Sequence, residues 1–167
     1  MKSELWYPLK NPDVVTQYFG DKTLPIYGPL GHPGWDIVGN FGQTIHAAHD
    51  GILITSAFDG IKGKGWYVEI ETPDKRDYAK TLYCHLREQS PRKQGGSVSC
   101  GDIIGYVGIT GNTTGAHLHF GVHDSTGNAI DPKPFWNGLY AQDYASWKTQ
   151  LAMITEKVAA LFKLLIK

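Results

Sequence analysis

The sequence lacks the features of membrane-spanning, disulfide-rich or nucleic-acid-binding proteins. It has no apolar run near the roughly 18 residues that a membrane-spanning helix needs, and only two cysteines, Cys84 and Cys100. The net charge at pH 7 is zero, with 16 Lys and Arg against 16 Asp and Glu, so we expect no nucleic-acid partner. For both cysteines we expect a structural role rather than a reactive one.

The first 15 residues do not have the pattern of a secretion signal. Residues 1–15 read MKSELWYPLKNPDVV and contain no apolar segment of the roughly 7 to 15 residues that a signal peptide needs. We therefore expect no Sec-type signal peptide.

Glycine and proline are abundant, with 20 and 9 residues, and they separate short runs rich in β-branched and aromatic residues. This pattern predicts many strands joined by tight turns within one domain. The expected strands are 14–19, 34–38, 44–48, 51–58, 65–72, 79–86, 102–108 and 117–123. Short connections favour an antiparallel sheet or sandwich over βαβ units, and the pattern becomes helical from Tyr144 onward.

The strand at 117–123 reads HLHFGVH and places apolar residues on one face and histidines on the other. Neighbouring imidazoles on one strand face suit a divalent metal, although an H-x-H pattern alone is weak in a chain with seven histidines. A zinc enzyme needs three protein ligands and a fourth position open to water, so further ligands must come from elsewhere.

Two upstream segments have the same H-x-x-x-D spacing. In GHPGWD, the Pro and Gly after His32 form a tight loop that can bring this histidine and Asp36 to one metal. In HAAHDG, His46 is followed by His49 and by Asp50, which precedes a glycine in a hairpin signal. We interpret Asp50 as a turn residue and the two histidines as surface or strand-end residues rather than ligands.

Strict alternation in TLYCHL, residues 81–86, orients a further histidine. It places Cys84 with Leu82 and Leu86 on one face, opposite Tyr83 and His85. His85 is therefore expected on the polar side of its strand.

Taken together, GHPGWD, LYCHL, GNTTGAHLHFGV and the DP at 131–132 resemble, in order and spacing, the lysostaphin-type (LytM-like) zinc peptidases that cut peptidoglycan. The similarity runs from about residue 14 to residue 136. It implies a mainly β fold, an antiparallel sheet or barrel-sandwich hybrid with a catalytic groove; the C-terminal amphipathic helix expected after it comes from periodicity alone. The expected division is a peptidase domain at 1–140 and a helix at 141–167.

The resemblance also implies the site. His32, Asp36 and His119 correspond to the ligands of one Zn²⁺ per chain, and His85 and His117 to the catalytic pair beside it. Which of that pair acts as general base, and which stabilises the oxyanion or protonates the leaving amine, stays open. His123, farther along the same face, is expected at the cleft rim and exposed to solvent.

Departures from the family pattern are modest. They comprise Ala116 where proline is common, Gly121 where a polar residue often follows the phenylalanine, and Trp35 before the aspartate. None removes a ligand, but Trp35 and the KGKGWY segment at 62–67 can shape the substrate groove, which puts the transfer of bond specificity in doubt.

The expected function is zinc-dependent hydrolysis of a cross-link or stem peptide bond of peptidoglycan, by a monomer acting at the cell wall or in the periplasm. Because no signal peptide is expected, we favour a phage endolysin released by a holin. The alternatives are the catalytic domain of a longer wall or virion hydrolase, a catalytically inactive wall-binding activator, and a structural zinc protein whose fourth ligand is His46 or Cys84.

The tail beyond the resemblance, residues 144–167, predicts an amphipathic helix. Its apolar stripe consists of Trp147, Leu151, Ile154, Val158, Leu161 and Leu165. Lys148, Lys157, Lys163 and Lys167 against Glu156 make the segment basic. The main interpretation is packing on the open face of the sheet, and the alternatives are contact with a membrane or lipopolysaccharide and self-association.

Overall fold

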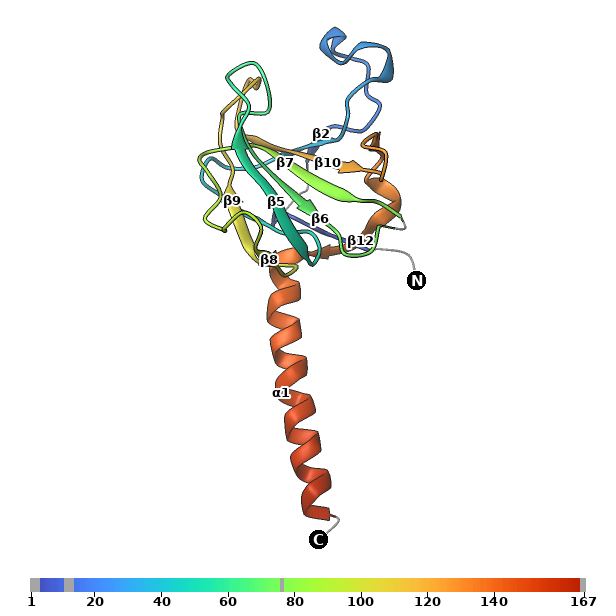
Figure 1. Ribbon diagram of the computed structural model, residues 1–167, viewed down its shortest axis with the longest axis vertical. Coiled ribbons are helices and arrows are strands. Elements are labelled where there is room, and N and C mark those ends of the chain that lie inside the picture. The colour runs from blue at the N-terminus through green and yellow to red at the C-terminus, as the bar shows by residue number, and fades with distance from the viewer. Residues whose placement is uncertain (1–3, 11–13, 76, 166–167) are drawn as a thin grey trace.

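The computed structural model describes residues 4–10, 14–75 and 77–165. They form a β-rich body from which a long helix projects (Figure 1). The main sheet is open and has eight strands, and every neighbouring pair is antiparallel. Its order is β2 (Val15–Gln17), β3 (Trp35–Val38), β10 (His117–His123), β7 (Lys80–Leu86), β6 (Trp66–Glu71), β5 (Gly51–Phe58) and β8 (Ser97–Val98), with β11 (Ala129–Ile130) pairing with β10.

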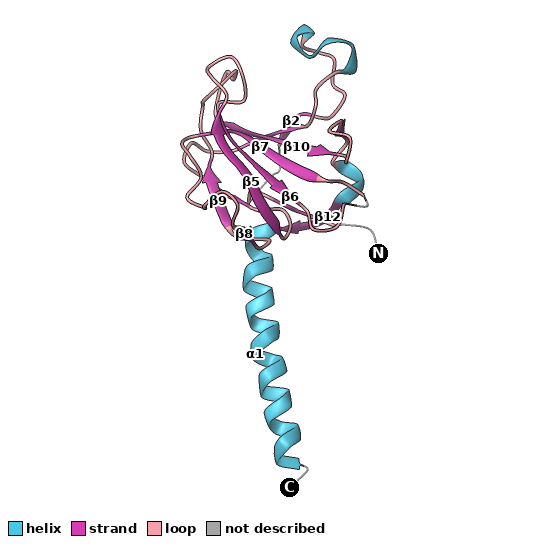
Figure 2. Cartoon of the chain, viewed as in Figure 1, coloured by secondary structure: helices cyan, strands magenta, loops and turns pink. Residues whose placement is uncertain are grey.

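Two smaller pairs complete the β structure (Figure 2). The first is antiparallel, β4 (Thr44–His46) with β9 (Ile103–Tyr106), and the second is parallel, β1 (Leu5–Tyr7) with β12 (Trp136–Tyr140). Short 3₁₀ segments occur at η1 (Pro25–Leu30) and η2 (Lys133–Phe135). The expected mainly β, antiparallel fold is confirmed as an open sheet rather than a closed barrel. The parallel pair was not predicted from the sequence, because its two strands lie at opposite ends of the β body's sequence.

The hydrophobic core joins the main sheet to the two smaller strand pairs. The apolar residues of β10 are fully buried in it, as the alternation predicted: Leu118, Phe120 and Val122. Other members come from β4, β9 and β1, namely Ile45, Ile104 and Leu5. Because the apolar face of β10 is fixed in this core, its histidine face must point to the other side of the sheet.

Helix α1 (Ala141–Leu165) begins beside the β1–β12 pair and then leaves the body (Figure 1). Its first turns are held by Trp6 against Tyr144, with ring centroids 4.6 Å apart. The stripe from Trp147 to Leu161 is 45–59% exposed, so the expectation that the helix packs on the open face of the sheet is wrong. Leu165 has no described side chain, and Lys167 lies outside the described residues. No helix in the described part of the chain combines the length and apolar character that a membrane crossing needs.

The packing of the core predicts that shortening a buried side chain of β10 lowers the stability of the fold. Phe120 is fully buried between Tyr83 and Trp136, with ring centroids 5.3 and 5.1 Å away. Phe120→Ala should therefore lower the free energy of unfolding by about 3–5 kcal/mol in urea titrations. Ile61→Ala, at a position that is 77% exposed, is the control and should change it by less than about 0.5 kcal/mol. Equal effects of the two substitutions would contradict this description of the core.

Candidate metal centre

The register of two neighbouring strands brings the first two candidate ligands together. Asp36 of β3 is paired with His119 of β10, and residues paired across an antiparallel ladder point to the same face. Nδ1 of His119 lies 2.9 Å from Oδ1 of Asp36. His117 lies two residues before His119, is paired with Val38 and projects from the same face. Its Nε2 is 3.6 Å from Oδ1 of Asp36.

His32 reaches the site from the loop that precedes β3. Its backbone is fixed at both ends, since its N–H donates to the Asp21 carbonyl and its carbonyl accepts from Gly20, both at 2.8 Å. Gly34 lets this loop lie on β10, because a Cβ there would overlap the Phe120 carbonyl oxygen and approach the His119 ring to 3.0 Å. The tight loop expected from GHPGWD is therefore required by close backbone packing.

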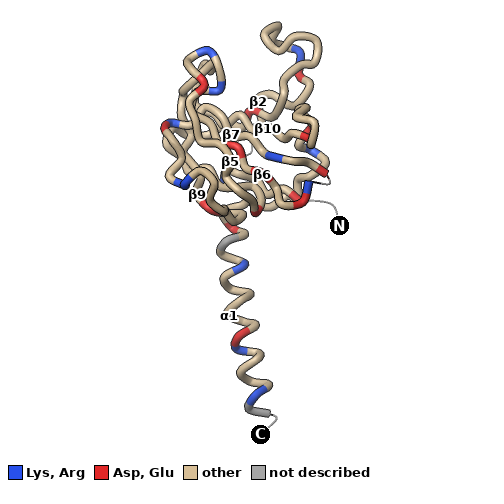
Figure 3. The backbone as a smooth tube through the Cα atoms, viewed as in Figure 1, with Lys and Arg blue, Asp and Glu red and all other residues tan. Residues whose placement is uncertain are grey.

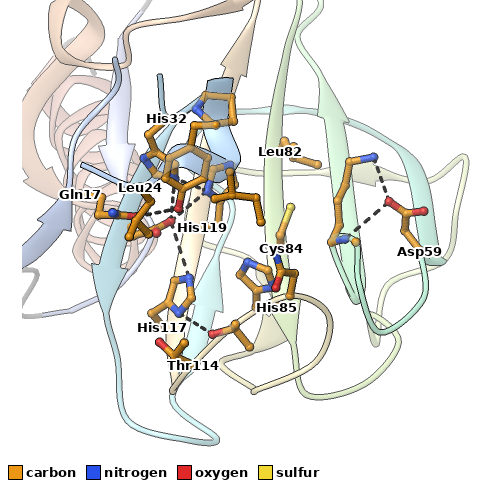
Figure 4. A pocket seen from close by; sticks show the side chains of 18 of the residues that line it. Gln17, Leu24, His32, Asp59, Leu82, Cys84, His85, Thr114, His117 and His119 are labelled. Carbon is orange, nitrogen blue, oxygen red and sulfur yellow. Dashed lines mark hydrogen bonds and ion pairs between the residues drawn. The ribbon is translucent and has the colours of Figure 1, made fainter. Parts of the chain in front are cut away.

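The ligand atoms of the three side chains converge on one point, and Figure 4 shows His32 and His119 side by side. Nε2 of His32 lies 3.1 Å from Oδ1 of Asp36 and 3.0 Å from Nδ1 of His119. All three residues are at least nine-tenths buried. Among the described residues, this is the group whose ligand atoms converge closely enough to hold a metal ion, and it includes neither His46 nor Cys84. A closed four-ligand structural zinc site is therefore not what the geometry favours.

The protonation states suit a metal. Burial by itself would raise the pKa of Asp36, but hydrogen bonds from His119 and His32 and the nearby imidazoles hold it well below its usual range. Burial lowers the pKa of His119, which keeps the ring neutral. Two neutral imidazole nitrogens and one carboxylate oxygen are a donor set that fits Zn²⁺, which requires deprotonated ligands.

His85 reaches the site through a β-bulge, not through alternation. Two residues of β7, Cys84 and His85, lie opposite Tyr67 of β6, and His85 has a φ of 62°, the only positive value among the described non-glycine residues. The predicted faces of β7 are wrong in part. Leu82 and Cys84 line the pocket while Tyr83 is in the core, and the bulge moves His85 to the pocket side and Leu86 into the core.

Backbone carbonyls orient both candidate catalytic imidazoles. Nδ1 of His85 is 2.8 Å from the Thr110 carbonyl, and Nδ1 of His117 is 3.0 Å from the Gly115 carbonyl. A carbonyl only accepts, so each Nδ1 carries the proton and each Nε2 keeps its lone pair. Burial, with the neighbouring His117, lowers the pKa of His85 to about 4, so this ring is neutral at pH 7. The two ring centroids are 4.7 Å apart.

Thr110 is a positioning residue that the sequence analysis missed. Besides its carbonyl, its hydroxyl donates to the Leu86 carbonyl at 2.6 Å and accepts from the Trp66 N–H at 2.9 Å. These contacts fix the bulge from both sides. The sequence showed only the GNTTG turn that follows Thr110, because the contacts join residues 24 and 44 positions apart.

A groove of about 570 Å³ opens over the three candidate ligands and the two candidate catalytic histidines. One wall comes from the segment around η1, where the Tyr27 hydroxyl donates to Oε1 of Gln17 at 2.6 Å, and the other from the 59–64 loop. His123 lines the same groove, and because it is half-buried, the expected solvent exposure is only partial.

The alternative histidines are structural. His46 ends β4 as a buried residue, and its Nδ1 is 2.7 Å from the Gly101 carbonyl. His49 is buried as well, between the Asp50 carbonyl and the Thr81 hydroxyl, each at 2.8 Å. Neither joins the cluster, as predicted, but neither is at the surface. Asp50 has the expected turn role and accepts the N–H of Cys100 at 2.7 Å.

Both cysteines are buried and free. Burial raises the pKa of both thiols, that of Cys100 to about 12 with help from the nearby Asp50 carboxylate. Neither thiol is therefore a thiolate nucleophile at pH 7, which agrees with the structural role expected from the sequence.

Comparisons with known proteins agree with this geometry. The model of the family described as Peptidase family M23 matches residues 30–132. The DD-carboxypeptidase/endopeptidase Mpg of Neisseria meningitidis serogroup B is 36% identical over 107 residues, which are 64% of this chain and 23% of Mpg. The chain thus matches less than a quarter of that curated relative's length.

Solved structures give the same result. The structure of a zinc-containing peptidase from Vibrio cholerae superposes with a TM-score of 0.66 at 28% identity, over 78% of this chain and 40% of that chain. The catalytic domain of the antimicrobial peptidase lysostaphin from Staphylococcus simulans gives 0.63 at 30% identity, over 73% and 90%.

The burial of His49 predicts a pH-dependent stability. Burial lowers the pKa of His49 to about 4 from an ordinary 6.5. Below pH 6.5, His49 therefore binds a proton in the unfolded chain but stays neutral in the folded chain until the pH approaches 4. This contribution to stability is complete above pH 6.5 and is lost as the pH falls toward 4. Between about pH 7.5 and about pH 5, wild type should lose about 2 kcal/mol more than His49→Gln in urea unfolding. Parallel pH profiles would show that His49 titrates normally in the folded protein.

Proposed function

Because the chain belongs to peptidase family M23, we propose that it is a zinc-dependent endopeptidase that hydrolyses peptide bonds of bacterial peptidoglycan. The observation that carries this proposal is the convergence of His32, Asp36 and His119 on one point in the wall of a groove. We assign the activity to residues 1–140 and treat α1 as a separate element. Because every ligand and both flanking histidines are present, an inactive wall-binding module is the weaker interpretation.

His32, Asp36 and His119 would hold the Zn²⁺, through Nε2, a carboxylate oxygen and Nδ1. When bound, the ion supplies a Lewis acid that polarises a scissile carbonyl and lowers the pKa of water toward about 7. Asp36 contributes the single negative charge of the ligand set, so the loaded site keeps a net positive charge facing the groove.

His85 and His117 handle the protons. Each presents the lone pair of Nε2, because a backbone carbonyl holds the Nδ1 proton. Either Nε2 can accept the proton that the attacking water loses, and a protonated imidazole can then return it to the leaving amine. The backbone of both residues is fixed. The N–H of His85 donates to the Lys64 carbonyl and the N–H of Gly108 donates to the His85 carbonyl, both at 2.9 Å, and His117 is paired with Val38 in the sheet.

Which peptide bond is cut stays open. The name of Mpg describes DD-endopeptidase activity, which favours the bond of a D-Ala cross-link. Identification by mass spectrometry of muropeptides released from walls of known cross-bridge would decide it. The role of an endolysin that a holin releases stays a prediction. It is tested by co-expressing the protein with a holin in a Gram-negative host and measuring the turbidity of the culture.

Helix α1 favours membrane contact as a second role. The side of α1 that contains Thr149 and Ala152 faces the 99–102 turn of the body, whereas the exposed apolar stripe faces away. At about 100° per residue, Lys148 and Lys157 flank the stripe on opposite edges. The ammonium of Lys148 lies 3.9 Å from Oδ2 of Asp50 in the body, whereas the stem of Lys157 can lie along apolar surface while its charge stays in water. Figure 3 shows positive residues recurring toward the far end of α1. We propose that this stripe binds an anionic membrane or lipopolysaccharide surface as a monomer.

The metal and the proton-handling residues can be separated by substitution. Purified protein should contain about one zinc per chain. His32→Ala, Asp36→Ala and His119→Ala should lose both zinc and hydrolysis. His85→Gln and His117→Gln should keep the zinc while their hydrolysis falls by about 100 to 10,000-fold. The measurements are metal content by mass spectrometry and muropeptide release from isolated sacculi.

Circular dichroism of each variant serves as the folding control for this series. Wild-type zinc content in Asp36→Ala would refute the ligand assignment. A fully active sample shown to be free of metal would refute the mechanism.

The role of α1 is tested by a matched pair of substitutions. Val158→Glu places a carboxylate within the apolar stripe, and Ala160→Glu places one about 200° away, on the opposite side. Both positions are exposed, so both variants should fold and hydrolyse isolated sacculi like wild type. Val158→Glu should bind vesicles of anionic phospholipid at least about tenfold more weakly in co-sedimentation, and Ala160→Glu far less so. Equal binding by the two variants, or concentration-dependent dimers in sedimentation velocity, would contradict the proposal.

A further inference from the structure

The far end of the groove is formed by His123, the last residue of β10. It lies four residues beyond His119 on the same strand face, so the two positions are roughly 13 Å apart along the strand. Between them, Gly121 has no side chain and pairs with Leu82, which also lines the groove. An extended peptide advances about 3.3–3.6 Å per residue. A substrate lying along β10 would therefore bring a group three or four residues from the scissile bond to His123.

The two ring nitrogens of His123 have different surroundings. Nδ1 is buried and has no hydrogen-bond partner. A buried N–H without an acceptor is rarer and costlier than an acceptor without a donor, so the proton belongs on Nε2. His123 therefore presents an N–H donor to the groove, whereas His85 and His117 present lone pairs. The histidine face of the groove thus changes from proton acceptors near the metal centre to a donor at its far end.

Positive charge accompanies this donor. Lys80 pairs with His123 across the sheet, but its ammonium is occupied by Oε1 of Glu69 at 2.6 Å. Lys64 lines the groove, and its ammonium lies 3.6 Å from the half-exposed carboxylate of Asp59 and 4.5 Å from the centroid of the Tyr67 ring. An exposed ion pair of this kind contributes little and can exchange partners. Burial and the charge of Lys80, with a smaller effect of Lys64, lower the pKa of His123, so the ring binds as a neutral donor.

We propose that His123 and Lys64 form a subsite that binds a carboxylate of the substrate peptide. Nε2–H of His123 donates to one carboxylate oxygen, and the Lys64 ammonium leaves Asp59 to neutralise the ligand's charge, which gives a charge-assisted contact. The inference rests on the proposed function, since wall peptides with free carboxyl groups are its substrate. It adds that the enzyme distinguishes such peptides from their amidated forms at a point remote from the reacting bond.

Steady-state kinetics on a matched substrate pair test the subsite. The substrates are a soluble cross-linked stem peptide with free carboxyl groups and the same peptide amidated. His123→Leu and Lys64→Gln should each raise KM for the free-carboxyl substrate by about tenfold and leave kcat nearly unchanged, because the contact is as strong in the ground state as in the transition state. Neither should change KM for the amidated substrate by more than about twofold. His123→Gln, which retains an N–H donor, should restore most of the affinity, and Lys93→Gln, on an exposed loop, is the charge control.

Equal losses on the two substrates would show that the bound oxygen is not a carboxylate, and no loss on either would show that the substrate does not reach His123.

A second measurement separates this inference from the proposed function. In metal-free wild type, nitrogen-15 NMR should show His123 protonated at Nε2, and adding the free-carboxyl peptide should shift this signal more than adding the amidated one. Protonation at Nδ1, or equal shifts, would overturn the subsite even if the enzyme cleaves both peptides. A wild type inactive on both would reject the proposed function but leave this NMR test valid.

Discussion

The pairing of β3 with β10 is the constraint on which the candidate site depends. It sets Asp36 directly opposite His119, at a spacing that only an aligned register gives. A slip of one strand by one residue would turn its site residue into the core, so that Ile37 would replace Asp36 at the groove, or Leu118 would replace His119. The register is protected because these two apolar residues are fully buried on the other face. The packing of the core and the placement of the ligands are therefore one requirement.

Burying three polar groups side by side is costly unless they satisfy one another. Asp36 accepts from the ring nitrogens of His119 and His32, which compensates the burial of its charge. In the described part of the chain, Nδ1 of His32 is buried without a hydrogen-bond partner, so the cluster keeps one polar atom that the fold does not satisfy. Two histidines with similar burial, His46 and His49, show the contrast: their ring nitrogens are satisfied by backbone carbonyls and threonine hydroxyls, so they stabilise the fold and are not free to coordinate.

Local strain is concentrated beside the candidate metal centre. A positive φ at a non-glycine residue costs of the order of 1–3 kcal/mol, and in the described residues it occurs at His85. Thr110 holds that conformation through its hydroxyl and its carbonyl, and the same carbonyl selects the tautomer of His85. Backbone geometry and proton chemistry are therefore set by one residue that need not touch the substrate.

The sequence by itself determined the parts that follow from short-range periodicity. The alternation of 117–123 determined one apolar face and one histidine face. The Pro-Gly loop before Asp36 indicated how His32 could reach the same metal as Asp36. Resemblance to a known family then assigned these residues to zinc. The tertiary structure decided what depends on segments far apart in the chain. A bulge against β6 placed His85, a buried Nδ1 gave His123 its donor, and the parallel β1–β12 pair joined the ends of the body. It also left the stripe of α1 exposed, because an amphipathic pattern shows that a helix has an apolar face but not which surface will cover it.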